Sequence, residues 1–161
     1  MGVKLNRVMQ HYLGGIIDIE LSNTLMSDPR VAALFDSVPL KTDDGTLVLP
    51  WTPNWKALRQ RSTTDLTGYE CLVNHVHLDN IIRDMPNAPR LRLKLALALG
   101  ENLGARLCET GPVTVIVSFD GEDAIVCVHR TRPGEAWLAD DLEGYTEGIL
   151  VIEESPMPSL T

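Results

Sequence analysis

Long apolar runs, paired cysteines and a signal sequence are all missing from this chain of 161 residues. No hydrophobic stretch approaches the roughly 20 residues that cross a bilayer, so we expect no membrane association. The opening stretch MGVKLNRVMQ lacks the apolar core of a signal peptide. The cysteines are odd in number, have no C-x-x-C spacing and lie in apolar settings that favour reduced, buried thiols: Cys71, Cys108 and Cys127. These absences predict a cytoplasmic protein without a disulfide framework.

Catalytic and nucleotide-binding signatures are also missing. The sequence contains no P-loop, no G-x-G-x-x-G stretch and no G-x-S-x-G nucleophile turn. The sequence therefore offers no recognisable residues for binding a nucleotide cofactor or for nucleophilic catalysis. We expect a protein that is not an enzyme, needs no cofactor and takes no small-molecule substrate.

What is present is typical of a globular domain. Hydrophobic residues make up 44% of the chain and charged residues 22%, which excludes a disordered protein. The length suits one domain with a substantial core. We predict a single domain over residues 1–154, followed by a flexible tail over residues 155–161, which contains two prolines.

Hydrophobic periodicity and capping residues predict four helices. Residues 3–13 have apolar side chains at helical spacing, Asp28 and Pro29 form a typical helix start, and Asn54 can cap a helix over residues 56–61. The helix that begins near Asp28 should end before Pro39. Residues 86–108 are rich in Leu, Ala and Arg without β-branched residues, which favours a helix over a strand. Residues 16–21 fit either a strand or a continued helix.

Six short segments have the composition of strands. Asp43-Asp44-Gly45 is typical of a hairpin turn and predicts strands over residues 38–41 and 46–49. Alternation suggests another strand over residues 70–78. Three apolar segments follow late in the chain, at residues 113–119, 124–130 and 148–153. Because the late strands follow one another through short turns, we predict an α+β fold with a mainly antiparallel sheet and several helices.

Negative charge is concentrated in the last third of the chain. Residues 111–161 contain ten acidic side chains and only two arginines, which gives this segment a formal charge of −8, the same as the whole chain. Such a field favours cationic protein partners and disfavours nucleic acid. Eight acids at turn and loop positions are the predicted partner-binding residues: Asp120, Glu122, Asp123, Glu135, Asp140, Asp141, Glu143 and Glu147.

Two histidines provide an alternative function. His75 and His77 are two apart on an expected strand and point to one side, where His129 could join them to bind zinc. The string from His75 to Asn80 is close to the H-x-H-x-D-H motif of metallo-β-lactamase-fold hydrolases, but Asn80 replaces its last histidine. The alternative is therefore a small zinc-dependent hydrolase that uses His75, His77 and His129, while a hydrogen-bonded or solvated pair of histidines remains the favoured interpretation.

Tryptophans can mark either a core or a binding surface. Trp51 and Trp55 lie between prolines and polar residues, and Trp137 follows a turn with the sequence Arg-Pro-Gly-Glu. Large aromatic side chains are mostly buried in folded proteins. We therefore expect all three rings to belong to the core.

The C-terminal sequence VHRTRPGEAWLADDLEGY, residues 128–145, leads into the strand GILVI, residues 148–152. This stretch resembles the closing part of immunity proteins from bacterial contact-dependent growth inhibition systems. The resemblance is confined to this C-terminal stretch of the chain. It implies a cytosolic inhibitor that binds the C-terminal domain of one cognate toxin, often a nuclease. Combined with the acidic loops, it predicts a protein that occludes the cationic active site of such a toxin.

Overall fold

The computed structural model describes residues 1–61 and 64–157. Its centre is a five-stranded antiparallel sheet in the order β1-β5-β3-β4-β2. The strands are β1 (Gly2–Leu5), β2 (His75–His77), β3 (Val113–Phe119), β4 (Ala124–Arg130) and β5 (Gly148–Glu154). The helices are α1 (Arg7–Gly14), α2 (Asn23–Met26), α3 (Pro29–Phe35), α4 (Trp55–Arg61), α5 (Leu66–Val73) and α6 (Ala88–Leu107), with short 3-10 turns at Leu78–Asn80, Cys108–Thr110 and Leu142–Gly144. The predicted α+β class and antiparallel sheet are confirmed.

The three central strands are apolar on both faces, as their sequences predict. β3 pairs with β4 from Val113 opposite Arg130 to Phe119 opposite Ala124, and β5 pairs along the whole of β3 on the other side. The turn between β3 and β4 contains Gly121 at φ +103°, a conformation that favours glycine. All three late strands were therefore predicted correctly.

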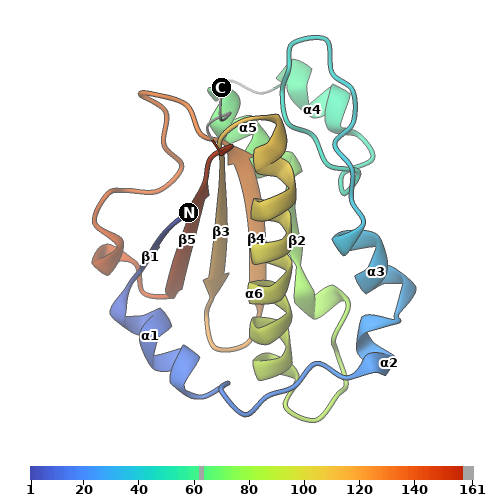
Figure 1. Ribbon diagram of the computed structural model, residues 1–161, viewed down its shortest axis with the longest axis vertical. Coiled ribbons are helices and arrows are strands. Elements are labelled where there is room, and N and C mark those ends of the chain that lie inside the picture. Colours follow the sequence, from blue (N-terminus) through green and yellow to red (C-terminus); the bar gives the residue numbers. More distant parts are fainter. Residues whose placement is uncertain (62–63, 158–161) are drawn as a thin grey trace.

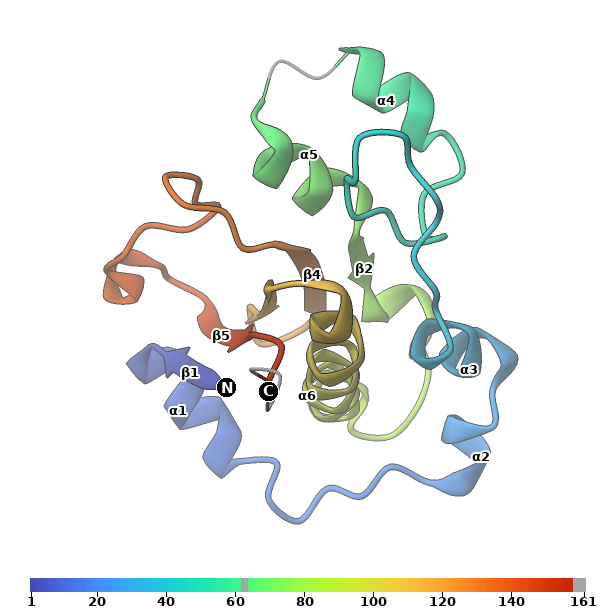
Figure 2. The same ribbon diagram turned by 45° about the horizontal axis from the view of Figure 1, so that its top comes forward.

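One face of the sheet is covered by the 20-residue helix α6, which lies along the strands (Figures 1 and 2). Four of its leucines are completely buried in the main core, together with residues of α3 and the 47–49 segment: Leu93, Leu95, Leu99 and Leu103. Gly100 allows the helix to lie close to the sheet, since an added Cβ would lie 3.2 Å from the Val117 side chain. We call this the helix face of the sheet, and it contains the main hydrophobic core.

The opposite face has a thinner cover, and we call it the open face. A smaller apolar cluster lies here, with Cys71 from α5 and residues of β3, β4 and β5. The segment of residues 131–147, between β4 and β5, contributes Leu138, Leu142 and Tyr145 to the cluster. In Figure 2 this segment extends away from the sheet on the side opposite α6.

Glu70 joins α5 to the sheet and to a distant loop. Its side chain is completely buried, and its two carboxylate oxygens accept hydrogen bonds from the Leu47 amide at 2.7 Å and the Arg130 amide at 2.6 Å. Arg132 binds both oxygens, at 2.6 and 3.0 Å. The carboxylate raises the pKa of Arg132 through this hydrogen-bonded pairing. Because both carboxylate oxygens of Glu70 are hydrogen-bonded, burying this charge costs far less free energy than burying an unpaired carboxylate.

The N-terminal prediction was partly wrong. Residues 2–5 form the edge strand β1, which pairs with β5, and the helix begins only at Arg7. Asn6 is its N-cap and accepts a hydrogen bond from the Met9 amide at 2.9 Å. The segment of residues 16–21, which could have been strand or helix, has neither structure.

Two predicted strand regions are also wrong. The segments 38–41 and 46–49 form a turn with one backbone hydrogen bond, from Leu40 to Val48, but no strand. Residues 66–73 form α5, so only residues 75–77 of the expected 70–78 strand are extended. The cause is an N-cap at Asp65, whose carboxylate accepts a hydrogen bond from the Gly68 amide at 2.8 Å and starts the helix.

The remaining helix predictions are confirmed. α3 begins with the Asp28 cap and ends before Pro39, α4 follows Asn54, and α6 spans nearly all of the predicted 86–108 segment. Trp51 and Trp55 are partly buried against the core clusters, in agreement with a packing role. In the described residues, no helix is both long and apolar enough to span a bilayer. The predicted tail at 155–161 lies partly outside the described residues, which end at residue 157.

Candidate binding surface

The eight predicted partner-binding acids divide into two groups. Five of them are engaged in hydrogen bonds that shape the fold: Asp120, Asp123, Glu135, Asp141 and Glu143. The carboxylates of Glu122, Asp140 and Glu147 make no hydrogen bond or ion pair with another described residue. The acidic segment therefore contains fewer free charges than its composition suggests.

The engaged acids hold turns and loops in place. Asp120 accepts hydrogen bonds from the amides of Asp123 and Glu122 at 2.8 and 2.9 Å, which lowers the pKa of the Asp120 carboxyl. Glu135 accepts from the amide and hydroxyl of Thr67 at 3.1 and 2.8 Å, which connects the 131–147 segment to α5. Glu143 accepts from the Arg7 amide at 3.1 Å, at the start of α1.

Asn6 fixes the far end of the 131–147 segment. It is completely buried, and its amide nitrogen donates to the carbonyl oxygens of Leu142 at 3.2 Å and Glu147 at 2.8 Å. Its side-chain oxygen accepts from Ile149 at 3.0 Å. Within the segment, the Ala139 amide donates to the Tyr145 hydroxyl at 3.0 Å. These hydrogen bonds give an irregular loop a defined position, which suits a recognition surface.

Trp137 is the most unusual side chain of this segment. Its residue is 51% exposed, so the expectation that it belongs to the core is wrong. The neighbouring Leu138 and Leu142 point into the open-face cluster instead and provide the packing that Trp137 was expected to supply. An exposed tryptophan on a fixed loop is a common feature of protein interfaces.

Two depressions of about 400 and 280 Å³ lie on the open face, and Trp137, Leu138 and Ile116 line both of them. Asp140 lies at the larger depression and Glu147 at the smaller one. Asp140 and Glu147, which carry two of the free carboxylates, therefore each share a depression with Trp137. Together, Trp137, Leu138, Ile116, Asp140 and Glu147 form what we call the Trp137 surface.

Two side chains near this surface, His129 and Cys71, have shifted pKa values. His129 lines the larger depression, and burial lowers the pKa of its imidazole. Its Nδ1 lies 2.8 Å from the Arg130 carbonyl oxygen, which accepts the hydrogen bond from the neutral ring. A hydrogen bond with Cys127 and burial raise the pKa of the Cys71 thiol, so this cysteine is a poor nucleophile. All three cysteines are free thiols, and Cys71 and Cys127 are buried as expected, whereas Cys108 is only partly buried.

The histidines of the zinc alternative are only partly brought together. His75 and His77 lie on the same side of β2, and their ring centroids are 5.5 Å apart. The Nδ1 of His75 faces the Leu72 carbonyl oxygen at 2.8 Å, and His77 contacts Asp123. In the described parts of the chain, the group with metal-binding spacing consists of His77, Asp79 and Asp123, without His75 or His129.

Sequence patterns missed this last group and the exposure of Trp137. Asp79 follows the strand of the two histidines, but Asp123 is 46 residues from His77, and only the pairing of β2 with β4 brings them together. The HxHxD string, residues 75–79, already indicated His77 and Asp79 as possible metal ligands. No pattern in the sequence around Asp123 indicated that it would join them.

Comparison with known proteins gives one match. The Uncharacterized protein PM0498 family matches over residues 4–160, almost the entire chain. Neither the curated proteins nor the solved structures contain a significant match.

Proposed function

The chain belongs to the Uncharacterized protein PM0498 family, and we propose that it is an immunity protein that binds and blocks a cationic bacterial toxin domain. The observation that carries the proposal is the exposed Trp137, which shares one surface depression with the free carboxylate residue Asp140 and another with Glu147. The similarity of residues 128–145 to immunity proteins of contact-dependent growth inhibition falls on the same segment. The proposed mode of action is occlusion, so no catalytic residue is required.

Recognition at this surface would combine two effects. The indole offers a large apolar contact at the centre, where interfaces obtain most of their affinity. The carboxylates add electrostatic complementarity to a basic active site and accelerate association. Nucleases that act on a polyanion have such basic clefts, so a nuclease domain is the toxin class that we favour.

The first test is protection and binding. The toxin domain encoded next to this protein's gene should be produced with and without the protein, and growth should be compared. Protection together with a 1:1 complex of the purified proteins would support the proposal. Absence of both would refute it.

The second test locates the contact surface. Asp140→Lys and Glu147→Lys together should slow association about tenfold at low salt, with a smaller effect at high salt. The control carries the same charge change at Asp18 and Glu20, two exposed acids in the connection between α1 and α2. Equal slowing by both double variants would show that net charge alone matters and would refute the assignment to the Trp137 surface.

A further inference from the structure

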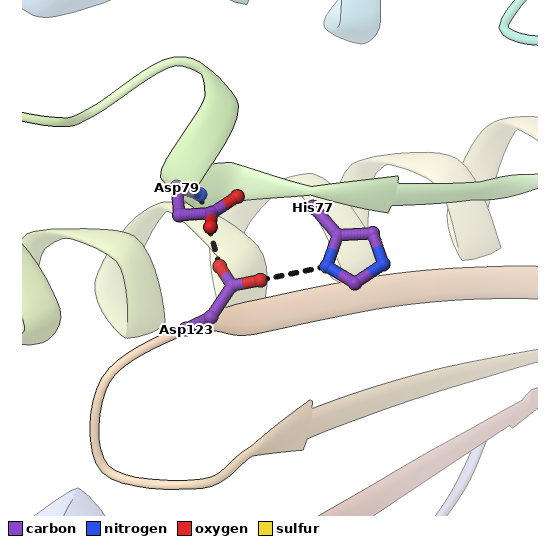
Figure 3. A group of neighbouring side chains, drawn as sticks. All are labelled: His77, Asp79 and Asp123. Atoms are coloured by element: carbon purple, nitrogen blue, oxygen red, sulfur yellow. Dashed lines mark hydrogen bonds and ion pairs between the residues drawn. The ribbon is translucent and has the colours of Figure 1, made fainter.

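Three side chains outside the Trp137 surface converge at the end of β2. His77 is the last residue of that strand, Asp79 lies in the following 3-10 turn, and Asp123 lies just before β4 (Figure 3). One potential ligand atom from each residue lies within 4.8 Å of the others. The His77 Nδ1 and an Asp123 oxygen are 2.7 Å apart.

The negative charges of this group are not neutralised by basic side chains of the described residues. Asp79 and Asp123 bring two carboxylates together, yet no lysine or arginine of the described residues forms an ion pair with either. Among the described residues, the ion-pair partner of Asp123 is the imidazole of His77, which is positive only when it is protonated. Like charges at this distance repel each other, and a bound cation would remove the repulsion.

The backbone around the group is already organised. The second oxygen of Asp123 accepts a hydrogen bond from the Asp79 amide at 2.9 Å, and the Asp123 amide is bound to Asp120. β2 is paired with β4 through His77 opposite Ile125. A ligand would therefore meet side chains whose backbone is fixed by the sheet, which lowers the entropic cost of binding.

We propose that His77, Asp79 and Asp123 bind a divalent transition-metal ion, with Zn²⁺ as the best match. A tetrahedral zinc ion with ligand distances of about 2.0–2.2 Å needs donor atoms roughly 3.4 Å apart. This separation exceeds the 2.7 Å between His77 and Asp123 and is below the 4.8 Å within which all three ligand atoms lie. The ion replaces the proton between His77 and Asp123, and water completes its coordination. The imidazole nitrogen favours zinc over Mg²⁺ and Ca²⁺, which prefer oxygen ligands only.

The direct test is titration of the full-length, metal-free protein with Zn²⁺, Mg²⁺ and Ca²⁺ by calorimetry. We expect one zinc ion per chain and binding at least tenfold weaker for the other two ions. At a free zinc concentration of 100 times Kd, the melting temperature should rise by about 5–10 °C. Failure to bind zinc, or equal binding of all three ions, would overturn the proposal.

Asp79→Asn is the decisive variant, because the Asp79 carboxylate makes no hydrogen bond that the metal-free fold needs. It should weaken zinc binding at least tenfold, whereas the melting temperature without metal should stay the same or rise, because one of the two like charges is removed. His77→Gln should weaken binding similarly. Unchanged binding in Asp79→Asn would exclude the proposed ligand set.

His75→Gln is the matched control, since His75 lies on the same strand, and its ring is adjacent to that of His77. We expect it to bind zinc like the unaltered protein. Loss of zinc in His75→Gln, with retention in Asp79→Asn, would move the site to the histidine pair and overturn the assignment. Toxin binding is measured separately, so the outcome here is independent of the proposed immunity function.

Discussion

The two faces of the sheet are held together in different ways. On the helix face, leucines of α6 and valines of β3 and β4 form a dry apolar core. On the open face, a few apolar side chains are joined to an irregular segment that depends on buried polar contacts, especially those of Asn6, Glu70 and Glu135. Because the larger apolar cluster lies on the helix face, we expect this face to provide most of the stability. The other face can therefore expose a tryptophan and free acids with little effect on the fold.

The largest effect should come from the helix face. Leu99 is completely buried between α6 and the sheet, so Leu99→Ala should reduce the free energy of unfolding by about 4 kcal/mol. Urea denaturation measures this change. A loss below about 1 kcal/mol would show that the helix-face core is not the main source of stability.

A polar contact of the open side should rank second. Glu70→Gln removes the negative charge that Arg132 and two backbone amides require, and we expect a loss of about 3 kcal/mol. The matched control is Glu122→Gln, at a carboxylate without a partner, which should leave the free energy of unfolding within about 0.5 kcal/mol. Similar effects from both variants would mean that the buried pairing adds nothing.

Two valines compare the faces directly. Val117 points to the helix face and Val151 to the open face, and both are buried. Val117→Ala should cost about 2 kcal/mol and Val151→Ala about 1 kcal/mol, because the thinner cover of the open face can relax into the space. Equal losses in urea denaturation would remove the distinction between the faces.

The pH dependence of stability should contain a contribution from His129 on the open face. Burial lowers its pKa in the folded state below the usual value of about 6.5, so the unfolded chain binds the proton more readily. The free energy of unfolding should therefore decrease as the pH falls below about 6.5. His129→Gln should reduce this decrease, measured between pH 7.5 and 5.5, whereas the exposed His11→Gln should not.

The smallest effect on stability is expected for Trp137→Ala. Because half of this residue is exposed, the free energy of unfolding should change by no more than about 0.5 kcal/mol. Affinity for the toxin domain should nevertheless fall at least tenfold. A large loss of stability would show that Trp137 packs as part of the core. Unchanged affinity would exclude Trp137 from the interface.

Local patterns were sufficient for the elements that carry strong, continuous signals. The apolar strands 113–119 and 124–130 and the leucine-rich helix over 88–107 follow directly from composition and turn residues. β1 was mistaken for part of a helix, because its structure depends on pairing Gly2 with Glu153, far away in the sequence. In α5, the alternation of apolar and polar residues predicted a strand. The segment forms a helix instead, which begins at the Asp65 cap and buries Glu70.

The candidate surfaces were less predictable than the fold. The negative charge of the last third was visible, but the separation of engaged acids from free ones needed the partners Thr67, Arg7 and His77. The exposure of Trp137 depends on Leu138 and Leu142 filling the cluster beneath it. Such outcomes are decided by three-dimensional packing, and residue type alone cannot give them.

The position of β5 between β1 and β3 has a consequence for the order of folding. β1 is synthesised well before β5, the strand with which it pairs at the edge of the sheet. Until then, one edge of β3 and the whole of β1 lack a partner, while α6 and the β3–β4 hairpin can already associate. We expect sheet completion to be a late, slow step that joins distant parts of the chain. During synthesis, the nascent protein would therefore expose an unpaired strand edge that is prone to aggregation and is a natural target for chaperones.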